Sequence, residues 1–260
     1  MSDEVLVEHD GALTTVTLNR PAAMNALDTA TKVALLAALR AADSDRQCRA
    51  ILLASAGDRA FCVGQDLREH VGNLQGDDPL ATVRDHYNPI ASVLYRTDKP
   101  VVAAVRGAAA GAGASLALLA DFRIGGPRTR FTMAFAGIGL AADTGASYTL
   151  PRIVGSAKAA EMLLLNTSVD ATEAARWGLL TELVADDAEV EPRARELATE
   201  LAAGPSLAYA QIKQQLRFRG DFDAALDGEA AAQAACGFST DHASAVASFV
   251  AKEKPTFHGR

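Results

Sequence analysis

The sequence is poor in cysteine, with three among 260 residues, at positions 48, 62 and 236. An odd count at wide spacing supplies neither a set of disulfide pairs nor the closely spaced ligands of a zinc site. We therefore expect three buried thiols and no metal centre. An apolar core must hold the fold together, and an apolar content of 49% is sufficient for one.

Long apolar runs and clusters of basic residues are also missing. No stretch reaches the roughly 18 apolar residues of a membrane span. The N-terminal MSDEVLVEHDG carries acids where a signal peptide has an apolar segment. The formal net charge is −7, with lysine and arginine scattered along the chain. This composition argues against nucleic acid and membranes as partners, and we expect a cytoplasmic protein.

What the sequence does contain is an alternation of strand-like and helical segments. VLVEHDG and LTTVTLNR flank Gly11 and predict a hairpin, while residues 29–45 and about 80–96 have helical patterns, the first capped by Asp28. Strand, strand, helix recurs along the chain, so we predict repeated ββα units. After residue 155 helices dominate, with one further strand expected at LLTELV, residues 179–184.

The composition changes at Gly204 and Pro205. These residue types mark boundaries, so we predict a mixed core over residues 1–204 and a helical region over residues 205–260. Apolar side chains of that region, such as Phe238, need a surface to cover, either the core or a neighbouring subunit.

Two glycine-containing loops are suited to binding. AFCVGQDL at residues 60–67 and GAAAGAGASLALLAD at residues 107–121 each follow a predicted strand and lead into a helix. Glycine permits close backbone approach, and the first N–H groups of a helix lack partners and lie at its positive end. The second loop could instead serve tight helix packing. A dinucleotide site fits poorly, because GxxxGxG is not GxGxxG.

These loops, with NRPAAMNALD at residues 19–28 and MAFAGIGLAADTGASYTLPRIVG at residues 133–155, resemble the enoyl-CoA hydratase/isomerase family, the crotonase superfamily, over essentially the whole chain. Within it, the chain looks most like the 1,2-epoxyphenylacetyl-CoA isomerase and Δ3,Δ2-enoyl-CoA isomerase branches. The resemblance implies an α/β fold of the ClpP/crotonase type, a spiral of ββα units with a helical C-terminal trimerisation region. It also implies an acyl-CoA substrate without a separate cofactor, and a homotrimer or a hexamer made as a dimer of trimers.

Carried over by position, the backbone amides of Gln65 and Ala112 form the oxyanion hole that holds the thioester carbonyl as it becomes an enolate. One such donor can be worth about 3 kcal/mol. Alanine at 112 replaces a family glycine but keeps the amide. The resemblance also implies coenzyme A and substrate contacts at Ala22, Ala23, Met24, Ala60, Val63, Gly64, Asp66, Gly111, Phe135 and Leu140. Phosphate contacts could come from Arg20, Arg59 or Lys254.

The resemblance is most informative about the catalytic acid. Hydratases of the family use two glutamates, and this sequence has Ser115 and Phe135 in their places, neither of which can serve as a general base. The isomerase branches place one carboxylate where Asp143 stands, and we predict that Asp143 shuttles the proton. Burial against apolar neighbours would raise its pKa. Alternatively, Asp143 could cap a helix starting at Thr144.

Other candidate side chains have ordinary alternatives. Ser115 lacks the GxSxG surroundings of a nucleophile and could simply pack. His70 and His86 could line a pocket or be solvated, and Tyr148 could reach the acyl chain or pack in the core. Asp66 is expected to cap the next helix, and substrate selectivity is expected in residues 68–95.

The sequence thus favours an acyl-CoA isomerase that works through a thioester enolate. One alternative is an enoyl-CoA hydratase in which Asp143 and a water molecule perform both proton steps. Another is a non-catalytic acyl-CoA-binding homologue, and a third is a dinucleotide-dependent oxidoreductase.

Overall fold

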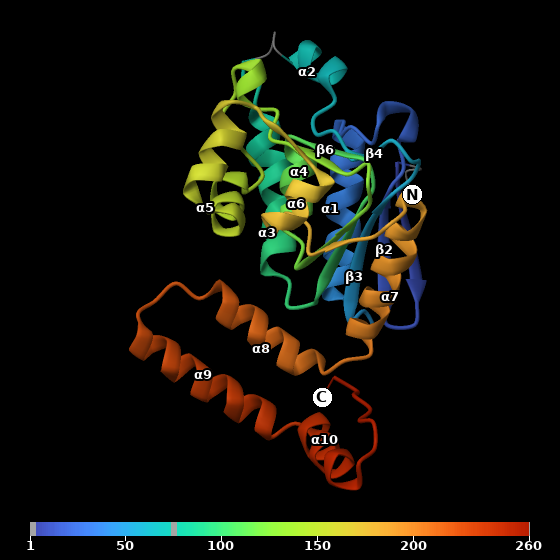
Figure 1. Cartoon of the computed structure of the whole chain (residues 1–260), viewed down its shortest axis with the longest axis vertical. Helices are drawn as coiled ribbons and strands as arrows, with labels where there is room; N and C mark the ends of the chain where they lie inside the picture. The colour runs from blue at the N-terminus through green and yellow to red at the C-terminus, as the bar shows by residue number, and fades with distance from the viewer. Residues whose placement is uncertain (1–3, 74–76, 260) are drawn as a thin grey trace.

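The computed structural model describes residues 4–73 and 77–259 of the chain. Within these ranges, two β-sheets form the centre of the fold (Figure 1). The larger sheet has six strands in the order β1 (Val5–Asp10), β2 (Leu13–Leu18), β3 (Ala50–Ser55), β5 (Val101–Val105), β7 (Phe122–Gly125) and β10 (Glu182–Leu183). The smaller sheet has four strands in the order β4 (Ala60–Cys62), β6 (Ala108–Ala110), β8 (Arg130–Thr132) and β9 (Ser168–Asp170).

The chain passes repeatedly from the larger sheet to the smaller one and then into a helix. β3 with β4, β5 with β6, and β7 with β8 each supply one strand to each sheet, and neighbouring units pair in parallel. Helices α3 (Asn88–Arg96), α4 (Ala112–Leu118) and α5 (Ala146–Leu164) lie in the crossovers that parallel strands require. The predicted spiral of ββα units is therefore confirmed, and it starts from the predicted hairpin of β1 and β2.

Helices cover both faces of the larger sheet. All residues of β3 and β5 are buried, as expected for parallel strands covered on both sides. On one face, α7 (Val190–Ala202) packs Ala198 against the sheet. On the other, α1 (Thr29–Ser44) contributes Leu35 and Leu39 to the main apolar core. This two-sided burial fixes β3 and β5, from which the chain continues into β4 and β6 of the smaller sheet.

The predicted helices of the core form, with one local difference. α1 begins at its predicted cap, because the Asp28 carboxylate accepts a hydrogen bond from the Thr31 amide at 2.8 Å. The helix expected over residues 80–96 starts with a π-helical turn, η2 (Val83–Tyr87), which continues into α3. The remaining α-helices of the core are α2 (Leu67–Asn73) and α6 (Ala171–Arg176), and three short 3₁₀ helices are η1 (Pro21–Ala23), η3 (Ala136–Ile138) and η4 (Asp187–Glu189).

The expectation of a single strand after residue 155 is wrong, because β9 pairs antiparallel with β8 ahead of β10. β9 has three residues, of which only Val169 is buried. One buried residue between two exposed ones carries no readable periodicity, so this strand is defined by its partner rather than by its own sequence.

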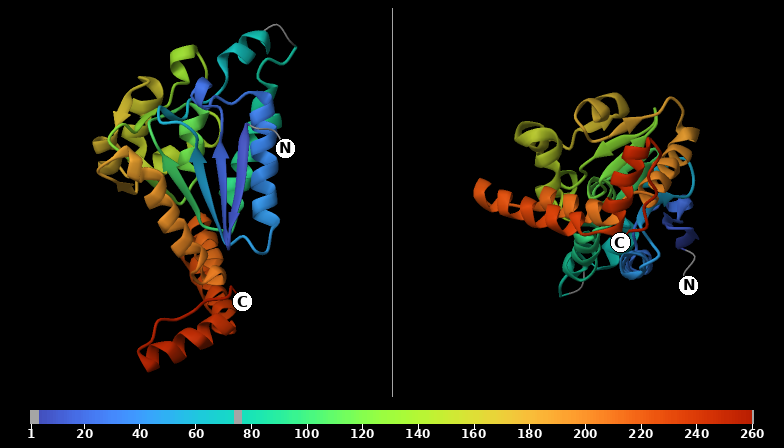
Figure 2. Two further views of the ribbon diagram at one scale, coloured as in Figure 1. Left: turned by 90° about the vertical axis from the view of Figure 1, so that its right-hand side faces the viewer. Right: turned by 90° about the horizontal axis from the view of Figure 1, so that it is seen from below.

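The C-terminal helices α8 (Ser206–Arg217), α9 (Phe222–Gly237) and α10 (Thr240–Ala251) project from the end of the core opposite α2 (Figures 1 and 2). Ion pairs join α8 to the core, from Lys213 to Asp121 at 2.5 Å and from Arg217 to Asp98 at 2.8 Å. α7 ends two residues before Gly204, so the change in architecture falls near the predicted boundary. The division into domains of residues 1–204 and 205–260 stays a prediction.

Two further expectations concern thiols and membranes. Cys48 and Cys62 are buried, but Cys236 on α9 is partly exposed, so the expectation of three buried thiols is wrong for one of them. Among the described residues, no helix combines the length and the apolar character that crossing a membrane requires.

Candidate active site

A cavity of about 970 Å³ opens beside the segments that follow β4 and β6. Its walls come from segments far apart in the sequence: residues 20–28, residues 63–69, Tyr87, residues 111–112 and residues 134–143. The spiral brings the ends of successive units together, so the glycine loops and the predicted acid share one space.

The two glycine loops touch each other through their backbones. Gly64 has a φ of +86°, and a Cβ atom there would lie 2.9 Å from the Ala110 carbonyl oxygen and 3.1 Å from the Ala112 nitrogen. A Cβ atom on Gly113 would overlap the carbonyl of Cys62. The glycines are needed because β4 and the start of α4 leave no room for side chains between them.

The amides of Gln65 and Ala112 both belong to residues that line this cavity. Ala112 is the first residue of α4, where an N–H group has no acceptor within its own helix. In the described part of the chain, neither amide donates a hydrogen bond to another protein group. Two donors are thus left available beside the cavity, at the positive end of a helix dipole in the case of Ala112.

Asp143 lines the same cavity, together with the apolar residues Phe135, Ile138 and Leu140. Burial raises the pKa of the Asp143 carboxyl group, and the hydrogen bond from the Thr144 hydroxyl at 2.8 Å opposes this only in part. The direction of the predicted pKa shift is therefore confirmed.

The alternative in which Asp143 caps a helix is wrong. α5 begins at Ala146, with Gly145 in the capping position at a φ of +81°. The Ala146 amide donates to the backbone carbonyl of Asp143 at 3.0 Å, not to its side chain. The Asp143 carboxylate therefore receives no backbone N–H bond in the described structure and stays available on the cavity side.

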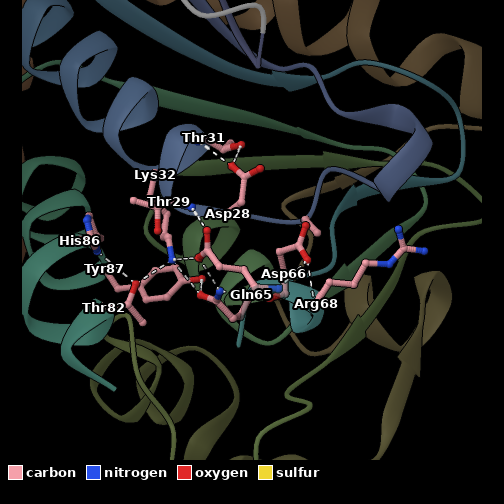
Figure 3. Close-up of polar contacts among 12 residues, drawn as sticks. Asp28, Thr29, Thr31, Lys32, Gln65, Asp66, Arg68, Thr82, His86 and Tyr87 are labelled. Atoms are coloured by element: carbon pink, nitrogen blue, oxygen red, sulfur yellow. Dashed lines mark hydrogen bonds and ion pairs between the residues drawn. The ribbon is translucent and has the colours of Figure 1, made fainter. Parts of the chain in front are cut away.

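A cluster of polar residues lies at and behind another side of the cavity, and we call its members Lys32, Gln65, Glu69, Thr82 and Tyr87 the polar wall (Figure 3). Lys32 is completely buried, and its ammonium group donates to Gln65 Oε1 at 3.0 Å, Glu69 Oε1 at 3.3 Å and Thr82 Oγ1 at 2.7 Å. The Tyr87 hydroxyl donates to the same Gln65 oxygen at 2.8 Å. Gln65, Glu69 and Tyr87 reach the cavity itself.

Sequence reasoning missed this wall, although one signal was present. Lys32 stands three residues before Leu35 and seven before Leu39, so it lies on the buried face of α1. A lysine at such a position must find acceptors inside the protein.

Glu69 is another carboxylate at the cavity, and both of its oxygens accept hydrogen bonds from protein groups. Its Oε2 accepts from the Thr29 amide at 2.8 Å, and its Oε1 accepts from Lys32 and from the Gln65 side chain, each at 3.3 Å. Burial alone would raise the pKa of Glu69, but the Thr29 bond and the Lys32 charge outweigh it and hold the pKa below its usual range. Glu69 is therefore a poor proton acceptor.

Most predicted contact residues line the cavity, and two do not. The cavity-lining ones are Ala22, Ala23, Met24, Val63, Asp66, Gly111, Phe135 and Leu140. Ala60 is buried in β4, and its carbonyl accepts a hydrogen bond from the Asn25 side chain at 2.9 Å. The carbonyl of Gly64 accepts from the Leu27 amide at 2.8 Å. Contacts of Ala60 and Gly64 with coenzyme A stay predictions.

Of the three basic residues expected near the phosphates, Arg20 lines the cavity and the other two do not. Arg20 lies there, but its guanidinium group pairs with Asp28 and Asp66, each at 3.0 Å. Arg59 and Lys254 are not among the lining residues. Arg68, which the sequence reasoning missed, is exposed at the cavity and points away from the polar wall (Figure 3).

The other candidates are accounted for individually. Asp66 caps α2 as predicted, accepting from the Arg68 amide at 3.0 Å. Ser115 is fully buried and donates to the Gly111 carbonyl at 3.1 Å, so it is a packing residue. His86 contacts Thr82 at 3.1 Å but does not line the cavity, and neither does His70.

Tyr148 lies away from the cavity, so it does not reach a ligand bound there. Its hydroxyl contacts Tyr95 at 3.1 Å and accepts from Arg219 at 2.8 Å. The predicted selectivity segment, residues 68–95, contributes Arg68, Glu69 and Tyr87 to the lining, while its residues 74–76 lie outside the described ranges.

Comparison with known proteins agrees with this architecture. The profile of a family described as Enoyl-CoA hydratase/isomerase matches residues 8–260. A Rhodobacter capsulatus protein named probable enoyl-CoA hydratase is 43% identical over 250 residues, 95% of each chain. The 1,2-epoxyphenylacetyl-CoA isomerase of Escherichia coli is 36% identical over 264 residues, 100% of each chain. The crystal structure of a Mycobacterium abscessus protein named as an enoyl-CoA hydratase/isomerase superposes with a TM-score of 0.95 at 44% identity, covering 98% of this chain and 100% of that one.

Proposed function

The chain belongs to the enoyl-CoA hydratase/isomerase family, the crotonase superfamily of acyl-CoA enzymes, and from this premise we propose that it is an isomerase rather than a hydratase. The observation that carries the choice concerns the carboxylates lining the cavity in the described structure, Asp28, Asp66, Glu69 and Asp143. The first three each have a cationic partner and a backbone N–H donor. Among the residues that the structure describes, the Asp143 carboxylate has only the Thr144 hydroxyl as a hydrogen-bond partner.

A single free carboxylate is sufficient to move a double bond. With the thioester carbonyl of a 3-enoyl-CoA between the amides of Gln65 and Ala112, Asp143 takes a proton from C2, and the electron pair spreads onto the carbonyl oxygen as a dienolate. Asp143 then returns the proton to C4, the double bond ends between C2 and C3, and the enzyme is unchanged. The two amides stabilise the charge that develops on the oxygen.

Hydration remains the second candidate, because the Rhodobacter capsulatus relative carries a hydratase name. Water addition needs one group to activate the water and another to handle the α-proton. By the family resemblance, Phe135 and the buried Ser115 stand in the places of the two glutamates, and Phe135 lines the cavity. These residues argue against efficient hydration.

The substrate contacts follow from the cavity lining. We assign the acyl group to the apolar side near Phe135, Ile138 and Leu140, and coenzyme A to the backbone around residues 22–24 and 63–66. Arg68 is a better candidate for the coenzyme phosphates than Arg20, whose charge Asp28 and Asp66 already balance. Replacing Arg68 by glutamine should raise KM for acyl-CoA but leave KM for a truncated pantetheine thioester unchanged.

We further propose a trimer, or a hexamer of two trimers, held by the projecting helices α8–α10. Phe238 is 93% exposed and Phe249 is 83% exposed, which is costly for large apolar side chains unless another surface covers them. Light scattering after size exclusion should give a multiple of three subunits. Phe249→Asp should shift the measured mass towards that of a single subunit. A wild-type mass equal to that of one subunit would refute the proposed assembly.

The test of the activity uses the wild type with 3-enoyl-CoA and with 2-enoyl-CoA, following double-bond migration and water addition as separate products. Migration should be much faster than water addition. The reverse order would make the protein a hydratase. Tight thioester binding without α-proton exchange in deuterated water would make it a non-catalytic acyl-CoA binder.

A further inference from the structure

Lys32 is a charged residue without solvent exposure, and no step of the proposed chemistry uses it. It does not line the cavity itself, but it donates hydrogen bonds to three other residues of the polar wall, Gln65, Glu69 and Thr82. We propose that Lys32 is a positioning residue, which with Tyr87 holds Gln65 so that the backbone amide of Gln65 faces the thioester carbonyl. This inference rests on the proposed function for the role of that amide.

The side chain of Gln65 is fixed at both ends. Its Oε1 accepts from Lys32 at 3.0 Å and from Tyr87 at 2.8 Å, which uses both lone pairs. Its Nε2 donates to the Asp66 carbonyl at 3.2 Å and to Glu69 at 3.3 Å. Because both polar atoms of the Gln65 side chain already have protein partners, the backbone amide is the donor of residue 65 that can bind the thioester carbonyl.

The backbone on either side of Gln65 is fixed as well. Gly64 fits against the Ala112 nitrogen, and the Asp66 amide donates to the Leu27 carbonyl at 3.1 Å. The close fit of Gly64, the Asp66 hydrogen bond and the bonds of the Gln65 side chain therefore all restrict rotation of the Gln65 peptide. Lys32 supplies one of those side-chain bonds.

The contacts of Lys32 are those of a protonated amine. Its three acceptors, on Gln65, Glu69 and Thr82, match the three donors of an ammonium group, and the ring of Tyr87 lies 5.2 Å from the nitrogen. An apolar side chain of similar size often gives equal or better stability than a buried ion pair. Stability alone therefore does not account for an ammonium group here, whereas control of Gln65 does.

The amides of an oxyanion hole act mainly on the transition state, so loss of their alignment should lower kcat more than it raises KM. A misplacement of about 1 Å can cost on the order of 100-fold in rate. We expect Lys32→Met to lower kcat for double-bond migration about 10- to 100-fold with KM changed less than about threefold. Tyr87→Phe, which removes one donor to Gln65 and keeps the ring, should lower kcat less.

The matched control is Lys213→Met. Lys213 is 9% exposed and donates to Asp121 at 2.5 Å and to the Lys99 carbonyl at 2.7 Å, so it is also a buried, hydrogen-bonded lysine, but one on α8 away from the cavity. Its replacement should lower the unfolding free energy and leave kcat per folded and assembled subunit unchanged.

A spectroscopic readout separates this inference from the proposed reaction. We would bind octanoyl-CoA labelled with ¹³C at the thioester carbonyl and record the carbonyl stretch by infrared difference spectroscopy. Hydrogen bonds to the oxygen lower this frequency, so the wild type should give a downshift that Lys32→Met and Tyr87→Phe reduce and Lys213→Met preserves. If the wild type shows neither migration nor α-exchange, the proposed function fails while this spectrum still tests the positioning.

An unchanged downshift and an unchanged kcat in folded Lys32→Met would overturn the inference. If that variant does not fold, Tyr87→Phe decides: a full downshift with wild-type kcat would contradict the role of the polar wall, and a reduced downshift would support it.

Discussion

The two sides of the cavity each present a carboxylate and treat it in opposite ways. On the polar wall, Glu69 is bound by the Thr29 amide, Lys32 and Gln65, and its pKa is held low. On the apolar side, Asp143 lies near Phe135, receives one hydroxyl bond and has a raised pKa. An acid at a cavity is thus not by itself a catalytic group, because its bonding partners decide whether it can exchange a proton.

The largest expected effect comes from neutralising each carboxylate in turn. Asp143→Asn should lower the rate of double-bond migration by about 10²- to 10⁴-fold, because an amide cannot accept the proton. Glu69→Gln should lower it by less than about tenfold, since Glu69 acts only through its neighbours. Chromatography of the enoyl-CoA products measures both rates. Equal losses of rate in the two variants would contradict different roles for Asp143 and Glu69.

The next prediction tests the contact between the two glycine loops. Gly64→Ala places a methyl group against Ala110 and Ala112, so it should spread the loops and lower kcat by about 100-fold. Gly11→Ala is the control, because Gly11 also has positive φ but has nothing within 4 Å of the added atom. In steady-state kinetics, kcat of Gly11→Ala should be close to that of the wild type. Equal kcat values of the two variants would show that the close contact between the glycine loops does not matter for activity.

A smaller effect is expected on the stability of the polar wall. Glu69→Gln removes the negative partner of the buried Lys32 ammonium and should lower the unfolding free energy by about 1–2 kcal/mol. Urea denaturation followed by circular dichroism measures this. Arg176→Gln, which breaks an exposed pair with Glu173, provides the control and should change stability by less than about 0.5 kcal/mol.

The smallest effect has the opposite sign and lies on the apolar side. A carboxyl group with a raised pKa in the folded state makes the fold less stable as pH rises through the interval between its unfolded and folded pKa values. Asp143→Asn should therefore be slightly more stable than the wild type at neutral pH, and this gain should vanish below the usual pKa of aspartate. Denaturation midpoints between pH 3.5 and pH 8 measure the difference, and a gain independent of pH would contradict the assigned shift.

The glycine loops were predictable from sequence because their function depends on backbone shape. Gly64 and Gly113 stand where a Cβ atom would collide with the other loop, and such positions leave a mark in the residue type itself. The repeated ββα units followed from the order of strand-like and helical segments, whereas the ClpP/crotonase fold type came from the resemblance to the family. The place of Asp143 came from resemblance to the family rather than from spacing.

The polar wall could not be predicted in the same way. Lys32, Glu69 and Thr82 are separated by long stretches of chain, and only the packing of α1 against α2 and η2 brings them together. A lysine in an amphipathic helix usually indicates a solvated position. The cap alternative for Asp143 failed for a local reason, because Gly145 takes the capping position with positive φ.

The most direct test of the central claim follows one deuterium atom through a single turnover. A 3-enoyl-CoA deuterated at C2 is converted in ordinary water, and the 2-enoyl-CoA product is analysed for deuterium at C4. If Asp143 takes and returns the same proton, a measurable fraction of the product carries deuterium at C4. Product without any deuterium at C4 would contradict the return of the same proton, and product with a hydroxyl group at C3 would contradict the assignment as an isomerase.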